Sequence, residues 1–224
     1  MDPLGNPVWH ALAGPQRTVA EGSARALRFA PDIAPFAALP DDVEPADWEA
    51  LRVLAGPGGV AVLGRPHVGA PVDLPRVFDI PGVQMVADRS VPDVARPTFR
   101  VLGDADADAM AELVARTQPG PWRTRTYTLG TYIGVHDGDR LVAMAGERMR
   151  PPGYTEISAV CTDPEYRGRG LAAGLVAELM DRIRARGEIP MLHAAAGNKT
   201  AVRLYEMLGF ELRRAVEFIG VQFP

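Results

Sequence analysis

A short run with two glycines has the composition of a phosphate-binding loop. Residues 163–174 read Asp-Pro-Glu-Tyr-Arg-Gly-Arg-Gly-Leu-Ala-Ala-Gly, between an expected strand and an expected helix. The start of a helix presents unpaired backbone N–H groups and the positive end of the helix dipole, so a diphosphate binds there readily. Gly168 and Gly170 lack a Cβ where a backbone must approach phosphate oxygens. The run predicts a diphosphate site, and a plain strand-to-helix turn is the alternative.

Two familiar nucleotide motifs do not fit this loop. No Gly-Lys-Ser or Gly-Lys-Thr follows it, so it is not a Walker loop. It also lacks the Gly-x-Gly-x-x-Gly fingerprint of dinucleotide-binding folds, and it follows a later strand of its unit rather than the first.

The elements that must position this loop lie in the second half of the chain. Apolar patterns predict strands at residues 99–102, 131–135, 141–145 and 156–161, and then at 191–194 and from 210 through 219. They predict helices beginning near 103, 170 and 198, the last two ended by Gly187 and Gly209. Asp137-Gly138 is a hairpin signal. The order β-α-β-β-β-α-β-α-β predicts a mixed α/β domain over residues 97–224.

The first half of the chain has weaker periodicity. We expect a smaller α+β domain over residues 1–96, with helices at 7–13, 18–27 and 45–54 and strands at 59–63 and 83–87. Residues 89–97 carry two prolines and scattered charges, and they are the predicted linker.

Bulk composition is that of an ordinary soluble globular protein. Of 224 residues, 47% are hydrophobic and 23% are charged, and no apolar run approaches the ~20 residues that span a bilayer. The N-terminus does not resemble a secretory signal, so a cytoplasmic location is the default expectation. The net charge of −4 does not favour nucleic acid as a partner. Cys161 is the only cysteine, which excludes an intrachain disulfide, and no histidine pair has metal-ligand spacing.

Two separate motifs together resemble a known superfamily. The first is Arg-x-x-Gly-x-Ala in the glycine loop, preceded by Val-x-x-Asp-Pro-x-Tyr. The second is residues 198–210, with an Asn…Ala…Leu-Tyr-Glu…Gly-Phe pattern. Both are similar to segments of the GNAT superfamily of N-acetyltransferases, and the likeness covers nearly all of residues 97–224. Residues 1–96 resemble the degenerate first halves of tandem GNAT-type proteins, such as glycine N-acyltransferase-like chains.

The resemblance implies a mixed, mostly antiparallel central sheet with flanking helices, and acetyl-CoA as co-substrate without a metal. It implies that main-chain amides of the loop bind the pyrophosphate: Arg167, Gly168, Arg169, Gly170, Leu171 and Ala172. It further implies that the main chain of Val160, Cys161 and Thr162 pairs with the pantetheine arm, and that Asn198 contacts the pantetheine region. Asn198 also has the place of a helix N-cap, and both roles can hold together.

The same resemblance implies two catalytic residues. Tyr205 corresponds to the tyrosine that protonates the departing thiolate, and its ordinary pKa of ~10 lies above that of a thiol. Tyr205 also lies on an apolar helical stripe, where a core role is the alternative. Glu156 corresponds to the acidic base on the strand before the loop, where partial burial would raise its pKa and improve it as a base. A strand-edge charge is the alternative for Glu156, and His193 and His136 are the other candidate bases.

The predicted function is acetyl transfer from acetyl-CoA to a primary amine by direct attack in a ternary complex. The alternatives are a catalytically silent module that binds acyl-CoA and an acyltransferase that uses a longer acyl-CoA. The acceptor site is expected around residues 117–130, the first half of the chain and a possible homodimer partner. Its chemistry stays open, from protein N-termini to polyamines, amino acids and antibiotic amines.

Overall fold

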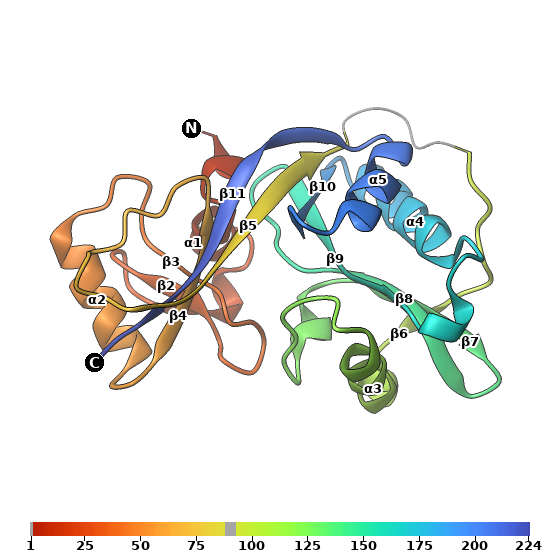
Figure 1. Ribbon diagram of the computed structural model, residues 1–224, viewed down its shortest axis with the longest axis horizontal. Coiled ribbons are helices and arrows are strands. Elements are labelled where there is room, and N and C mark those ends of the chain that lie inside the picture. The colour runs from red at the N-terminus through yellow and green to blue at the C-terminus, as the bar shows by residue number, and fades with distance from the viewer. Residues whose placement is uncertain (1, 88–92) are drawn as a thin grey trace.

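The computed structural model describes residues 2–87 and 93–224 (Figure 1). The helices are α1 (Pro7–Ala13), α2 (Pro45–Ala55), α3 (Ala107–Thr117), α4 (Leu171–Ala185) and α5 (Lys199–Met207). The strands are β1 (Ala20–Gly22), β2 (Leu27–Phe29), β3 (Ala37–Ala38), β4 (Val60–Arg65), β5 (Arg76–Val86), β6 (Arg100–Leu102), β7 (Tyr132–Asp137), β8 (Arg140–Glu147), β9 (Tyr154–Thr162), β10 (Ile189–Ala195) and β11 (Glu211–Gln222). Within the described residues, no helix is long and apolar enough to cross a bilayer.

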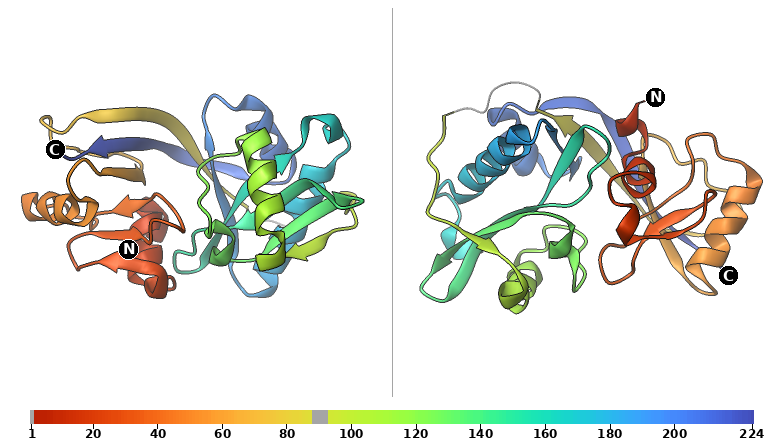
Figure 2. Two further views of the ribbon diagram at one scale, coloured as in Figure 1. Left: turned by 90° about the horizontal axis from the view of Figure 1, so that it is seen from below. Right: turned by 180° about the vertical axis from the view of Figure 1, so that it is seen from behind.

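One large mixed sheet runs through the molecule. Its strand order is β4-β11-β5-β10-β9-β8-β7-β6, and the only parallel pair among these described strands is β9 with β10. The long strands β5 and β11 form a curved ribbon that reaches from the α4 and α5 side of the molecule to the α1 and α2 side (Figures 1 and 2). The strands β4 and β5 of the first half therefore belong to the same sheet as β9, the strand that precedes the glycine loop.

Alternating side chains on the central strands serve two different cores. Ile133, Ala143 and Ala145 pack with the apolar stripe of α4 and with α5. Tyr132 and Met144 point to the opposite face, where α3 packs. This period of two is what a strand buried on both faces requires. The glycine loop at the start of α4 therefore rests on a sheet that is covered on both sides.

The predicted order of elements over residues 97–224 is confirmed. The hairpin turn at Asp137-Gly138 joins β7 to β8, and Gly138 has a φ of 59°. The stripe of α4 is fully buried at Leu175, Leu179 and Ile183. The mixed sheet with flanking helices is the expected fold class.

The helix predicted at residues 18–27 is wrong. The segment is a short 3-10 turn followed by the antiparallel hairpin of β1 and β2. Gly22 has a φ of 121°, and a Cβ there would lie 2.1 Å from the Ala26 carbonyl oxygen, so this position admits only glycine. Leu27 and Phe29 are buried on either side of the half-exposed Arg28, which is a strand pattern that overrides local helix propensity. The predicted linker at residues 89–97 lies partly outside the described residues.

Candidate active site

A cavity of about 1190 Å³ opens beside the glycine loop. It is bounded by β9, the loop, the start of α4, the end of β10 and one face of α5, and at its far end by side chains from β4, β5 and β11. Of the residues expected to bind a cofactor, these line it: Val160, Cys161, Thr162, Arg167, Gly168, Gly170, Leu171, Ala172, Asn198 and Tyr205. Arg169 does not line the cavity. Its guanidinium donates to the Glu165 carbonyl and lies 4.6 Å from the ring centroid of Tyr166.

The cavity exists because β9 and β10 separate. Their parallel pairing ends at the register pair Met191 and Glu156, yet β9 continues to Thr162 and β10 to Ala195. Ala159 lies at a bulge in β9 opposite β8 and has a φ of 52°, which a non-glycine residue rarely adopts. Residues 157–162 of β9 and 193–195 of β10 thus face the cavity rather than each other.

The loop has the backbone shape of an anion site. Gly168 and Gly170 both have a φ of 76°, and the space where a Cβ would stand is open at each. Gly170 is the N-cap of α4, so the first N–H groups of a 15-residue helix lie at the cavity wall. Gly174 has another role, because a Cβ there would lie 2.6 Å from the Ala95 carbonyl oxygen. The segment before β6 therefore crosses closely over the first turn of α4.

Tyr205 is both a core and a cavity residue. It is 8% exposed, and its ring packs edge-on against Phe210 with centroids 5.9 Å apart. Burial, with a smaller contribution from Cys161, raises the pKa of Tyr205 to about 12, so its hydroxyl stays protonated at neutral pH. Burial likewise raises the pKa of the Cys161 thiol to about 11, which keeps that residue an unreactive thiol.

Glu156 is fully buried in a charge network. Both its carboxylate oxygens accept hydrogen bonds from Arg148, at 2.8 Å each, and Oε1 also accepts from His193 Nδ1 at 2.8 Å. Burial alone would raise the pKa of Glu156, but the Arg148 guanidinium and the His193 hydrogen bond outweigh it and bring the pKa to about 2. The expectation of a raised pKa for Glu156 is therefore wrong. Burial raises the pKa of a carboxyl that has no cationic partner, whereas Glu156 has Arg148.

His193 is held from both ring nitrogens. Nδ1 donates to Glu156, and Nε2 lies 3.1 Å from the side-chain nitrogen of Gln84, which also donates to the Leu4 carbonyl. Because Gln84 supplies N–H groups to both neighbours, Nε2 accepts this hydrogen bond and Nδ1 is the ring donor to Glu156. The ring lines the cavity beside Phe218. His136, the other histidine candidate, lies on β7 next to Arg100.

The low pKa of Glu156 predicts an acid-sensitive fold. A carboxyl whose folded pKa of about 2 lies below its ordinary 4.5 stabilises the fold fully above pH 4.5, and this stabilisation is lost as the pH falls towards 2. We expect the free energy of unfolding, measured with urea, to decrease over this interval. The double variant Arg148→Met, Glu156→Met removes both charges together and should show a shallower decrease. An equally steep decrease in the double variant would contradict this assignment.

Asn198 takes the predicted capping role. Its Oδ1 accepts from the Ala201 N–H at 3.1 Å, and the side chain lies at the cavity wall. Capping leaves its side-chain NH₂ group free to reach a cofactor. Among the described residues, no group of three or more His, Cys, Asp or Glu side chains is arranged to hold a metal ion.

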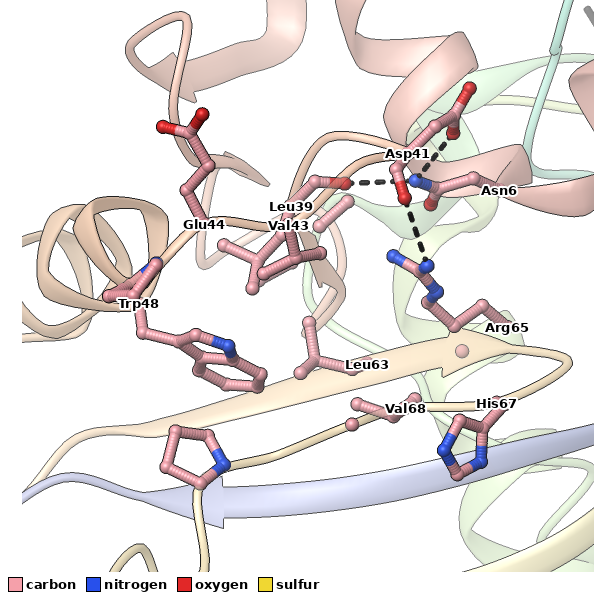
Figure 3. A pocket seen from close by; sticks show the side chains of 16 residues that line it. Asn6, Leu39, Asp41, Val43, Glu44, Trp48, Leu63, Arg65, His67 and Val68 are labelled. Atoms are coloured by element: carbon pink, nitrogen blue, oxygen red, sulfur yellow. Dashed lines mark hydrogen bonds between the residues drawn. The ribbon is translucent and has the colours of Figure 1, made fainter.

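A second cavity, of about 510 Å³, lies in the first half of the chain. Figure 3 shows the Trp48 indole and the side chains of Leu39, Leu63 and Val68 around it. Its polar rim is already engaged, since Asn6 donates to Asp41 and Arg65 donates to the Asp41 carbonyl (Figure 3). None of the motif residues reaches it, so the larger cavity is the candidate active site.

Known proteins are similar to this chain in sequence and in fold. The FR47-like protein family model matches residues 132–219, which include β9, the glycine loop and α5. The crystal structure of a putative acetyltransferase from the GNAT family of Novosphingobium aromaticivorans superposes with a TM-score of 0.91 at 41% identity, covering 100% of both chains. The chain belongs to the GNAT superfamily. It is an acetyltransferase of that superfamily, as the two sequence motifs implied.

Two relatives of this GNAT protein match different lengths of the chain. The N-alpha-acetyltransferase RimI of Mycobacterium tuberculosis is 34% identical over 130 residues, which cover 53% of this chain and 81% of the relative. An uncharacterized protein of Mycobacterium leprae is 32% identical over 206 residues, which cover 79% of this chain. The chain spans 55% of the length of that second relative.

Several parts of this GNAT site had no local signal in the sequence. Arg148 follows β8 in an ordinary Glu-Arg-Met-Arg run, and the Ala159 bulge involves no glycine. The sequence does single out Gln84, because it is the one polar residue in the apolar run Val-Gln-Met-Val of β5, a pattern that indicates a buried polar contact. The aromatic side chains at the far end of the cavity are Phe78 of β5, Phe218 of β11 and Phe36, which directly precedes β3, so they are distant in the sequence.

Proposed function

We propose that the protein transfers the acetyl group of acetyl-CoA to a primary amine in a ternary complex. The observation that carries the proposal is the cavity itself, which joins the N-terminal end of α4 to the separated ends of β9 and β10. A diphosphate at the loop would place an extended thioester arm along β9. The thioester would then lie near Tyr205 and His193, which both line the same cavity.

The loop and its neighbours supply the binding groups. In this proposal main-chain N–H groups of residues 167–172 hold the pyrophosphate, as Gly168 and Gly170 permit. The main chain of Val160, Cys161 and Thr162 pairs with the pantetheine arm, and Asn198 contacts it from α5. Arg167 and Arg203 also line the cavity, and in this proposal their guanidinium groups pair with further phosphate charge.

The reaction requires one proton to leave the amine. The amine nitrogen attacks the thioester carbonyl carbon, the C–S bond breaks, and the sulfur leaves as a thiolate. Among the described residues that line the cavity, His193 is the one imidazole, and in this proposal its Nε2 accepts the proton. Glu156 then acts through His193, because its carboxylate stabilises the imidazolium through Nδ1. The acceptor amine must take the place of Gln84 at Nε2 to deliver its proton.

Tyr205 assists the thiolate as a hydrogen-bond donor in this scheme. With a pKa of about 12, full proton transfer from the phenol to a thiolate with an ordinary pKa near ~8.5 would be uphill. A donated hydrogen bond needs no such transfer and stabilises the charge that develops on sulfur.

Tyr205→Phe tests this role. A hydrogen bond to a charged group contributes about 1.5–3 kcal/mol, so we expect kcat to fall roughly 10- to 100-fold with little change in acetyl-CoA affinity. The measurement is thiol release from acetyl-CoA with a panel of primary amines, beside calorimetric titration with coenzyme A. An unchanged kcat would remove Tyr205 from the chemistry, and the absence of thiol release with any amine would contradict the proposed function.

A further inference from the structure

The far end of the cavity is built from flat aromatic rings. Phe218 of β11 lies between two glycines of neighbouring strands, where a Cβ at Gly64 or Gly82 would come within 2.8 Å or 2.7 Å of its ring. Phe78 of β5 lies over Gly220 in the same way, with a Cβ there 2.4 Å from the ring. Three missing Cβ atoms thus let two rings lie against the sheet as part of the cavity wall.

These rings adjoin the residues that would handle the amine proton. Phe218 packs edge-on against His193 with centroids 5.6 Å apart. Phe36 contributes a third ring, which lies 6.4 Å from Phe218 and carries the Arg148 guanidinium over its face at 4.8 Å. An amine that reached His193 would therefore have the rest of its body against aromatic carbon.

The charged side chains of the cavity wall also favour an acceptor with an uncharged body. None of the described residues that line the cavity is aspartate or glutamate, whereas four are arginine: Arg123, Arg148, Arg167 and Arg203. Arg148 is offset by Glu156. A second cationic group on the acceptor would find no carboxylate partner here. The free-energy cost of removing it from water would therefore not be offset.

We propose that the acceptor is a primary amine on an uncharged apolar body, aromatic or alkyl, with no second cation. The inference rests on the proposed function and names the substrate class of the same site. Burial of a phenyl-sized body against these rings should improve kcat/KM on the order of 10- to 100-fold over an amine without one.

The test compares two probes on the intact chain. Thiol release from acetyl-CoA is measured with phenethylamine and with putrescine, and phenethylamine should have the higher kcat/KM by at least about 10-fold. Ile80→Asp places a carboxylate at the cavity wall on a side chain that is 45% exposed, so the fold should tolerate it. This variant should lose activity with phenethylamine and gain it with putrescine. Val77→Asp is the matched control, since Val77 is 48% exposed on the same strand and does not line the cavity.

Three results would overturn the inference. Putrescine could be preferred by the unaltered chain, or Val77→Asp could change the preference as much as Ile80→Asp does. Octanoyl-CoA could be preferred to acetyl-CoA, with Ile80→Asp abolishing that preference, which would assign the rings to an acyl chain. A chain that binds coenzyme A yet releases no thiol with any amine would overturn the proposed function as well, so the two failures are distinguishable.

Discussion

Replacing Gly170 with valine is expected to weaken coenzyme A binding on the order of 100-fold, about 2.7 kcal/mol. Gly170 has a φ of 76° and caps the helix whose first N–H groups face the cavity. A β-branched residue cannot hold this conformation without a strain of about 1–3 kcal/mol, so the loop must rearrange. Its N–H groups would then no longer converge on a diphosphate. Calorimetric titration with coenzyme A measures the effect.

Gly153→Val provides the matched control. Gly153 also has a positive φ, of 80°, and an open Cβ position, but it lies in the exposed turn before β9 and does not line the cavity. Both variants should lose similar stability in urea, and only Gly170→Val should lose affinity. Equal affinity in the two variants would show that the loop is not the diphosphate site.

His193→Asn is expected to lower kcat on the order of 100-fold, as loss of a positioned general base commonly does. Asparagine can still donate to Glu156, so the buried carboxylate keeps a partner, but it cannot accept the amine proton. The measurement is thiol release from acetyl-CoA at saturating amine, compared between the unaltered chain and the variant.

His136→Asn is the control for this substitution. His136 lies on β7 and bonds Arg100 rather than any residue of the cavity wall. We expect its kcat to match that of the unaltered chain. A kcat in His193→Asn equal to that in His136→Asn would show that another group takes up the amine proton.

Elements with strong local patterns could be predicted from the sequence. The helix that begins near residue 170 and the hairpin turn at Gly138 are each specified by nearby residues, and both elements are confirmed. The hairpin of β1 and β2 was missed because its alternation is short and a single glycine decides the turn. The strand predicted at residues 83–87 is the end of the much longer β5, whose first residues are exposed and include a proline.

Features of the site that depend on distant partners could not be predicted. Glu156 was recognised as a candidate, but the sign of its pKa shift depends on Arg148 and His193, which only the folded sheet brings to it. The aromatic end depends on Phe36, Phe78 and Phe218, and no local pattern relates residues so far apart. In the sequence, the glycines beneath two of these rings indicate only loops or weakened strands. Only the folded sheet shows that their missing Cβ atoms make room for the rings.

Hydrogen–deuterium exchange with and without coenzyme A follows the main-chain amides of the glycine loop, which are proposed to bind the pyrophosphate. Exchange at residues 167–172 and 160–162 should become slower when coenzyme A saturates the chain. Unchanged exchange there, with protection instead around Trp48 and the second cavity, would contradict the proposed pyrophosphate site.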